Sequence, residues 1–212
     1  MNLQEVREFI EILASVHPHA QSELYFTSPF TLLVAVVLSA QATDASVNKV
    51  TPTLFELANT PQAMVALGLE TLEKLISSIG LWRAKAKHIL QLSQQLIDNF
   101  NGIVPNNRQD LESLAGVGRK TANVVLNVAF HQNTMAVDTH IFRLSNRTGL
   151  APGKNTLEVE MALVKRIPKH YLRDSHHWLI LHGRYTCKAR KPECWRCPTR
   201  DVCHYNHKQL TV

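Results

Sequence analysis

Residues 111–126 read LESLAGVGRKTANVVL, and this stretch decides how the middle of the chain folds. The pattern predicts a short helix up to about Leu114 and a second helix from about Arg119. Gly116-Val117-Gly118 between them predicts a tight turn, because glycine adopts positive φ and brings no Cβ near an approaching molecule. We expect Val117 at the tip of this turn. The second helix then offers its N-terminal amides and positive dipole end to a phosphate group.

This segment resembles a helix–hairpin–helix element, which grips the DNA backbone without reading base sequence. The plainer interpretation is an ordinary helical hairpin whose glycines serve packing. A basic residue directly after the second glycine favours backbone binding. The candidate DNA contacts in the hairpin are therefore Gly116, Val117, Gly118 and Arg119.

Lys120 follows in the first turn of the second predicted helix, where the positive dipole end disfavours an ammonium group. We expect partial burial as well, and both effects favour the neutral amine. A neutral amine is the form that attacks a sugar C1′ to give a Schiff base. Lys120 is therefore a candidate catalytic nucleophile. From its position alone, the alternative is one more phosphate-binding cation.

Asp138 directly precedes another predicted helix in the segment MAVDTHIFR, residues 135–143. Its plain role is that of an N-cap. A carboxylate held rigidly in that way can also stabilise positive charge as a glycosidic bond breaks, or move protons for Lys120. The two roles are compatible, so Asp138 is the second catalytic candidate. His140 is a candidate DNA contact, with a structural histidine as the alternative.

The rest of the chain shows helical signals and no convincing strand pattern, so we predict an all-α fold. Ser28 and Thr60 each precede a proline and are predicted N-caps, and Asn155 is a third. Residues 30–40 are apolar nearly all round, which predicts a buried central helix. The stripe of the first predicted helix consists of Leu3, Val6, Phe9, Ile10 and Leu13.

A long helix is predicted from about Arg83 to Asn99, with Gly80 and Gly102 at helix C-cap positions on either side of it. The helix that Asn155 caps is expected to end before Pro168. Three histidines near Trp178 are interpreted as structural, and they are His176, His177 and His182.

All four cysteines lie within the last 26 residues, with the spacing C-x6-C-x2-C-x5-C. Thiolates gathered so closely predict a metal site. Spacing alone suits either tetrahedral zinc or an iron–sulfur cluster. The predicted ligands are Cys187, Cys194, Cys197 and Cys203. Lys191, between the first two, is a candidate phosphate contact, and the alternative is a solvated basic loop.

Composition sets broad limits on the class of protein. The chain has 212 residues, of which 45% are hydrophobic and 19% charged, with a net charge of +6, so a folded core and a polyanionic partner are expected. The N-terminus has no secretory signal pattern, and the apolar stretch 30–38 is too short to cross a bilayer. We therefore expect a cytoplasmic, nucleoid-associated monomer with no obligate protein partner.

Five segments together resemble the endonuclease III family. They are LSAQATD (38–44), LAGVGRKTANVVL (114–126), AVDTHIFR (136–143), APGKN (151–155) and HWLILHGRYTC (177–187). The resemblance implies that Lys120 forms a Schiff base, that Asp138 is the essential carboxylate and that the cysteines hold a [4Fe–4S] cluster. It also implies an enzyme that removes oxidised or saturated pyrimidines from double-stranded DNA and then cleaves the abasic site by β-elimination.

The resemblance further implies two helical lobes with a DNA-binding cleft. One is a six-helix domain, residues 22–132, which contains the hairpin. The other is a cluster domain made of residues 1–21 and 133–212. A flipped-out nucleotide leaves a gap in the duplex, and the resemblance places Gln41 and Leu81 at the tips of two loops that fill it. Without the family, an exposed leucine after a C-cap glycine would be a hydrophobic cap contact.

Two rival functions are weighed against this hypothesis. A monofunctional glycosylase of the same fold would lack a lysine at position 120. A noncatalytic DNA-binding module with structural zinc would keep the hairpin and the basic loop without needing Lys120 and Asp138 together.

Overall fold

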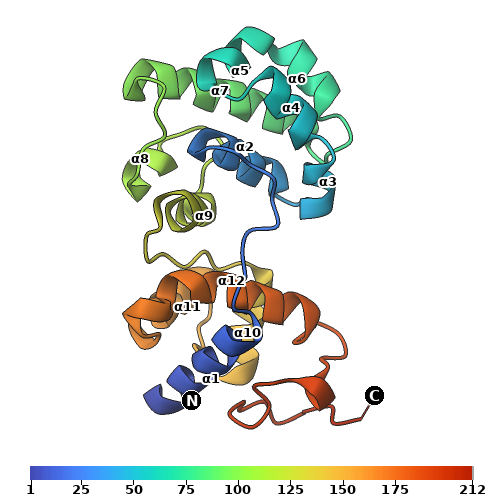
Figure 1. The fold of residues 1–212 in the computed structure, drawn as a ribbon, viewed down its shortest axis with the longest axis vertical. Coiled ribbons are helices and arrows are strands. Elements are labelled where there is room, and N and C mark those ends of the chain that lie inside the picture. The colour runs from blue at the N-terminus through green and yellow to red at the C-terminus, as the bar shows by residue number, and fades with distance from the viewer. Residues whose placement is uncertain (212) are drawn as a thin grey trace. The chain divides into compact units, whose positions relative to one another are not determined.

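The computed structural model describes residues 1–211, which form twelve α-helices, one short 3-10 helix and no strand (Figure 1). The all-α prediction is therefore confirmed. The chain divides into two compact units, Ser22–His131 and Met1–Gln21 together with the chain from Gln132 onward. We call them the hairpin unit and the cysteine unit. The boundaries expected from the family resemblance differ from these by one residue, at position 132.

The hairpin unit is built around one fully buried helix. Its elements are α2 (Pro29–Ser39), α3 (Asp44–Asn48), α4 (Thr51–Leu57), α5 (Pro61–Leu67), α6 (Leu69–Leu75), α7 (Trp82–Phe100), α8 (Arg108–Glu112) and α9 (Arg119–Phe130). Every residue from Phe30 to Leu38 is at most 5% exposed, which confirms the predicted central helix. Ser28 begins α2 as predicted, since its side chain accepts a hydrogen bond from Thr31 N.

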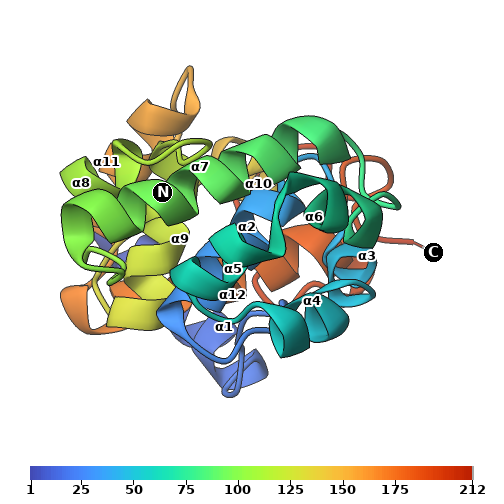
Figure 2. The ribbon, with the colours of Figure 1, turned by 90° about the horizontal axis from the view of Figure 1, so that it is seen from above.

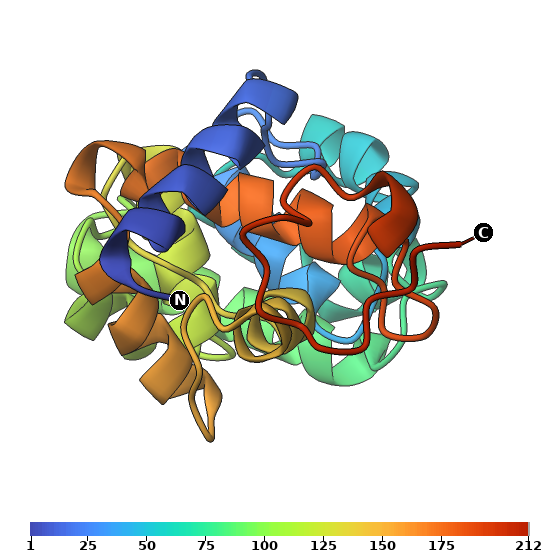
Figure 3. The ribbon, with the colours of Figure 1, turned by 90° about the horizontal axis from the view of Figure 1, so that it is seen from below.

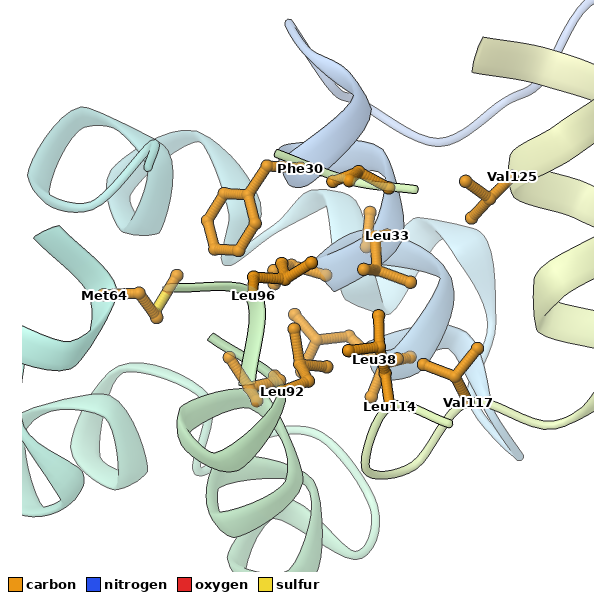
Figure 4. Close-up of a cluster of buried hydrophobic side chains, with 14 of the residues drawn as sticks. Phe30, Leu33, Leu38, Met64, Leu92, Leu96, Leu114, Val117 and Val125 are labelled. Carbon is orange, nitrogen blue, oxygen red and sulfur yellow. The ribbon is translucent and has the colours of Figure 1, made fainter. Parts of the chain in front are cut away.

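Helix α2 fixes the positions of α7 and the hairpin because its side chains pack against both (Figure 4). Each large apolar side chain buried in such a core contributes about 1.5–3 kcal/mol. The labelled side chains come from α2, α5, α7, the hairpin and α9, and they are Phe30, Leu33, Leu38, Met64, Leu92, Leu96, Leu114, Val117 and Val125. Seen from above, the long α7 runs beside α5 and α6 (Figure 2).

The long helix α7 spans the range predicted for it to within one residue at each end. Its C-cap is Asn101, and Gly102 follows one residue later with φ of 75°. The prediction that Gly80 caps a helix is wrong, because α6 already ends at Leu75. Gly80 instead lies in the loop that leads into α7.

The cysteine unit contains α1 (Leu3–Val16), α10 (Thr139–Thr148), α11 (Thr156–Arg166), α12 (Lys169–Tyr185) and a 3-10 turn, Cys194–Arg196. Helix α1 packs beside α12 (Figure 3), and most of its apolar stripe is buried there. Leu3 is the exception at 66% exposed, because it begins the helix and lies one turn before the packed residues. Asn155 caps α11 as predicted. None of the helices within residues 1–211 has the length and apolar character needed to span a bilayer.

Candidate functional site

The two glycines of the hairpin turn have different structural roles. Gly116 has φ of 74°, and a Cβ there would lie 2.9 Å from the Cβ of His88 on α7, so the fold itself requires glycine. Gly118 is the N-cap of α9 with φ of −95°, and a Cβ there would meet nothing within 4 Å. Gly118 therefore does not use the positive φ that glycine permits. Because Gly118 has no side chain, the space beside the first backbone amides of α9 is open.

Val117 does not lie at an exposed tip. Its side chain is 5% exposed and packs in the core near Leu38 and Leu114 (Figure 4). The turn is closed by a hydrogen bond from Val117 N to Leu114 O at 3.1 Å. The predicted DNA contact of Val117 would therefore involve its backbone and not its side chain, because this apolar side chain is more stable in the core.

Helix α7 holds the hairpin turn through Gln95. Its Oε1 accepts a hydrogen bond from Ala115 N at 2.8 Å, and its Nε2 donates to Ser113 O at 3.3 Å. Both ends of one amide side chain thus fix the backbone just before Gly116. Sequence reasoning missed Gln95, because no local pattern indicates a contact across about twenty residues.

Lys120 lies in the first turn of α9, as predicted, but its side chain is exposed rather than partly buried. The N-cap of α9 is Gly118, which has no side chain to cap the helix, and the first turn of α9 contains no acidic residue. The first backbone amides of a helix have no partner inside the helix. An exposed amine and a set of uncapped amides therefore meet at one helix end, next to the open space at Gly118.

The loops that carry Gln41 and Leu81 lie against each other within the hairpin unit. A Cβ added at Gly80 would be 4.0 Å from the Gln41 carbonyl oxygen. Both residues have left-handed backbone, with φ of 54° and 61°, and both side chains are exposed, Leu81 to 60%. Such a conformation costs about 1–3 kcal/mol for a residue other than glycine, and it is found preferentially at functional sites. Leu81 is the N-cap of α7, so it is not the hydrophobic C-cap contact that we considered.

Asp138 caps α10 as predicted, since its Oδ1 accepts a hydrogen bond from Ile141 N at 2.8 Å. The carboxylate is half-buried and held in a fixed orientation by that bond. His140 is also half-buried, and its Nδ1 lies 3.4 Å from Nη2 of Arg143. A Cβ on Gly183 of α12 would lie 3.0 Å from the Cβ of His140, so α10 and α12 pack closely at this point.

The same helix that carries Asp138 also holds the start of the cysteine loop. Arg143 donates two hydrogen bonds to Cys187 O, at 3.0 and 3.2 Å. Arg147 donates to Lys188 O at 2.6 Å and to Ala189 O at 3.0 Å. Sequence reasoning missed both arginines, although a spacing of four places them on one face of a helix.

All four cysteines line one cavity and none forms a disulfide. The cavity has a volume of about 20 Å³ and is partly open to solvent. Three of the sulfurs have donors beside them: Arg147 Nη1 is 3.6 Å from Cys187 Sγ, Thr199 Oγ1 is 3.4 Å from Cys197 Sγ, and Tyr205 N is 3.5 Å from Cys203 Sγ. Within residues 1–211, no three His, Cys, Asp or Glu side chains converge on the position of a single metal ion.

Burial controls the titration of the groups around this cavity. It raises the pKa of the thiols of Cys187, Cys197 and Cys203. It also lowers the pKa of His182 to about 4, so this imidazole is neutral at neutral pH. His182 Nε2 lies 3.6 Å from Cys197 Sγ. The interpretation of His182 as merely structural overlooked this contact with a cysteine.

The basic residues of the cysteine loop are not equivalent. Lys188 and Arg196 both pair with Glu193, and Arg200 pairs with Asp201. Lys191 is exposed, with left-handed backbone at φ of 48°. Among the cations of this loop, Arg190 and Lys191 have no carboxylate partner anywhere in residues 1–211. Lys191 thus extends into solvent in the way that a phosphate contact requires.

Comparison with known proteins identifies the family. Residues 34–169 match the HhH-GPD superfamily base excision DNA repair protein family, which is more than half of the chain. The chain belongs to this superfamily. This HhH-GPD protein is 55% identical to endonuclease III of Haemophilus influenzae over 208 residues, covering 98% of the chain and 99% of that relative. Its identity to endonuclease III of Escherichia coli K12 is 54%, with the same coverage.

Solved structures give the same result. A trapped endonuclease III–DNA covalent intermediate matches the HhH-GPD protein with a TM-score of 0.91 and 49% identity, over 96% of each chain. A non-covalent endonuclease III–DNA complex matches equally well. A thermostable thymine-DNA glycosylase shares the fold, with a TM-score of 0.87 at 23% identity. The resemblance to endonuclease III and the predicted class, base-excision DNA repair, are therefore confirmed.

Proposed function

We propose that Lys120 and Asp138 carry the chemistry of this base-excision DNA glycosylase and abasic-site lyase. The observation that carries the proposal is the exposed amine of Lys120 at the uncapped end of α9, beside the open space at Gly118. The endonuclease III relative that was trapped as a covalent intermediate with DNA supports a mechanism with a covalent step. Oxidised or saturated pyrimidines in double-stranded DNA are the proposed substrates.

The substrate is held through its backbone and opened at one nucleotide. The amides at the start of α9, together with Arg119, contact phosphates in the hairpin unit, while Lys191 and His140 contact DNA from the cysteine unit. The damaged nucleotide leaves the base stack so that its C1′ can be reached. Leu81 enters the gap as an apolar wedge, and Gln41 hydrogen-bonds the base that has lost its partner.

Lys120 then acts as the nucleophile in the first step, and the Schiff base that it forms makes the second step possible. Its neutral Nζ attacks C1′, the bond between C1′ and the base nitrogen breaks, and the base departs with a proton. The sugar ring opens to a Schiff base between Nζ and C1′. Loss of a proton from C2′ breaks the bond between C3′ and its phosphate oxygen, which is β-elimination. Hydrolysis of the Schiff base returns Lys120 to its starting form.

Asp138 is assigned the role of stabilising charge. As the bond to the base breaks, positive charge develops on the sugar, and a fixed carboxylate stabilises that charge without reorganising. The hydrogen bond from Ile141 N fixes Asp138 Oδ1 and leaves the other carboxylate oxygen for the substrate or for proton transfer. The cap and the catalytic role thus use different oxygens of one side chain.

The four cysteines fit a [4Fe–4S] cluster, which is the cofactor that we propose. All four thiols line one cavity, and their C-x6-C-x2-C-x5-C spacing matches the cluster site of the endonuclease III family that the chain resembles. The donors beside three of the sulfurs suit ligated thiolates. When bound, the cluster supplies structural cross-links that fix the loop carrying Lys191. Thiols that ligate iron must stay reduced, which supports a cytoplasmic, nucleoid-associated setting.

The purified protein is expected to be brown, with four iron and four sulfide ions per chain by metal and sulfide analysis. Replacing Cys203 with serine removes one thiolate, so the iron content falls and the Tm decreases. Tyr185→Phe, at an exposed position outside the cavity lining, serves as the control that keeps its iron. One zinc ion per colourless chain, with no sulfide, would contradict the cluster assignment and favour the DNA-binding module.

Replacing Gly118 with alanine is expected to weaken DNA binding without disturbing the fold. The φ of −95° suits alanine, and the new Cβ projects into the space beside the phosphate-binding amides. Losing one or two amide–phosphate hydrogen bonds raises Kd roughly tenfold, for damaged and undamaged duplex alike. Fluorescence anisotropy with both duplexes measures this.

Gly116→Ala is the matched control in the same turn. Its left-handed φ and the contact with His88 make alanine strained, so the free energy of unfolding falls by about 1–2 kcal/mol or more. An unchanged Kd for Gly118→Ala, with an unchanged Tm, would contradict phosphate binding at this helix end.

A further inference from the structure

Lys85 is a buried lysine for which the proposed chemistry has no use. Its side chain is 4% exposed in the second turn of α7, and its Nζ donates a hydrogen bond to Leu38 O at 2.9 Å. Burial lowers the pKa of Lys85. An amine in an apolar core with a single acceptor is unfavourable compared with an apolar side chain of the same size. Its presence therefore calls for a role that an apolar residue could not fill.

The bond joins the supports of the two loops described above. Leu38 lies in the last turn of α2, three residues before Gln41. Lys85 lies one helical turn after Leu81, and its N–H bonds to Leu81 O at 3.1 Å. The last carbonyls of a helix have no partner inside the helix and carry its negative dipole end, so a lysine amine suits this place. One side chain thus ties the end of α2 to the start of α7.

The backbones of the two loops also meet directly. A Cβ added at Gly80 would lie 4.0 Å from the Gln41 carbonyl oxygen, and both tip residues have left-handed backbone. Such tips are determined by the elements that support them rather than by their own conformational preference. The distance between the ends of α2 and α7 therefore decides where both tips lie.

We propose that Lys85 is a positioning residue that fixes Gln41 and Leu81 relative to each other, so that both enter the same gap in the duplex. The inference rests on the proposed function, which assigns these two residues to the gap. Lys85 itself contacts no DNA. Without this hydrogen bond the two tips move independently, so they must become ordered relative to each other when they enter the duplex. In the native protein they are ordered before DNA binds, and this cost is avoided.

The test compares duplex with single-stranded DNA, each containing one abasic site. Lys85→Met keeps the length and apolar contacts of the side chain but cannot donate a hydrogen bond. Under single-turnover conditions, the enzyme concentration for half-maximal rate is expected to rise roughly 10- to 100-fold on duplex. The maximal rate on duplex and the rate of single-strand cleavage are expected to stay within about twofold of the wild-type values. A general loss of stability would lower both rates and would not produce this pattern.

Further variants make the result decisive. Lys87→Met removes the same charge from an exposed position of α7, and it is expected to lack the effect specific to duplex. Gln41→Ala/Leu81→Ala is expected to show the same selective loss on duplex, and adding Lys85→Met to it brings no further loss. Lys85→Leu, which also lacks a hydrogen-bond donor, replaces Lys85→Met if that variant does not fold.

Each outcome then has one meaning. Losses that multiply when the variants are combined, or equal losses on duplex and single strand, would overturn the role of Lys85. A defective Gln41→Ala/Leu81→Ala variant beside a normal Lys85→Met variant overturns the inference alone. A normal Gln41→Ala/Leu81→Ala variant overturns the gap-filling part of the proposed function, and the inference with it.

Discussion

Replacing Lys120 with alanine is expected to reduce strand cleavage at an abasic site by on the order of 10³-fold or more, because the attacking amine is gone. DNA binding is expected to fall much less, since an exposed cation contributes only about 1 kcal/mol to holding phosphate. Single-turnover cleavage of an abasic duplex, together with Kd from fluorescence anisotropy, separates the two effects. The exposed position of Lys120 on α9 makes a folding defect unexpected.

Lys120→Arg decides between the two roles considered for this residue. Arginine keeps the positive charge and binds phosphate well, but its guanidinium does not lose its proton in proteins and cannot act as the nucleophile. We expect binding close to that of the wild type and cleavage as low as in Lys120→Ala. Cleavage restored by arginine would show that Lys120 only binds phosphate.

Replacing Asp138 with asparagine is expected to reduce turnover on a damaged base by roughly 10²- to 10⁴-fold while the protein stays folded. Asparagine is as good an N-cap as aspartate, so the hydrogen bond from Ile141 N is kept and only the charge is lost. The measurements are the rate of base release and the Tm.

Asp138→Ala provides the comparison that isolates the cap. It removes both functions, so its free energy of unfolding falls by a further ~1 kcal/mol relative to Asp138→Asn. Turnover by Asp138→Asn at the wild-type rate, with Asp138→Ala impaired only in stability, would mean that Asp138 is an N-cap and nothing more.

Local signals predicted the helix boundaries well. Ser28, Thr60, Asp138 and Asn155 all begin helices as expected, because a side chain that accepts a hydrogen bond from an amide two or three residues later is encoded within one turn. The hairpin turn was predicted equally well, from its two glycines. These parts of the fold depend on neighbours in sequence.

Side-chain burial was harder to predict because it depends on distant parts of the chain. Val117 packs against α2 rather than projecting from the turn, and Lys120 is exposed where partial burial was expected. Gly80 lies between helices because α6 ends early. In each case the packing of several helices, which no single segment encodes, decided the environment.

The contacts that support the candidate site were missed for the same reason. Lys85 reaches Leu38 across 47 positions, and Arg143 reaches Cys187 across 44. Gln95, which clamps the hairpin, is an ordinary polar residue of a long helix when read in sequence. Motifs therefore predicted the residues proposed to meet the substrate, while the residues that hold them emerged only from the structure.

The most direct test of the central claim is borohydride reduction of the protein on a duplex with one abasic site, followed by peptide mapping of the product. Borohydride reduces a Schiff base to a stable amine, so it joins the protein to the DNA permanently. We expect a covalent adduct on the peptide that contains Lys120, and none with Lys120→Ala. No adduct despite tight binding, or an adduct on a different residue, would contradict the assignment of Lys120 as the nucleophile.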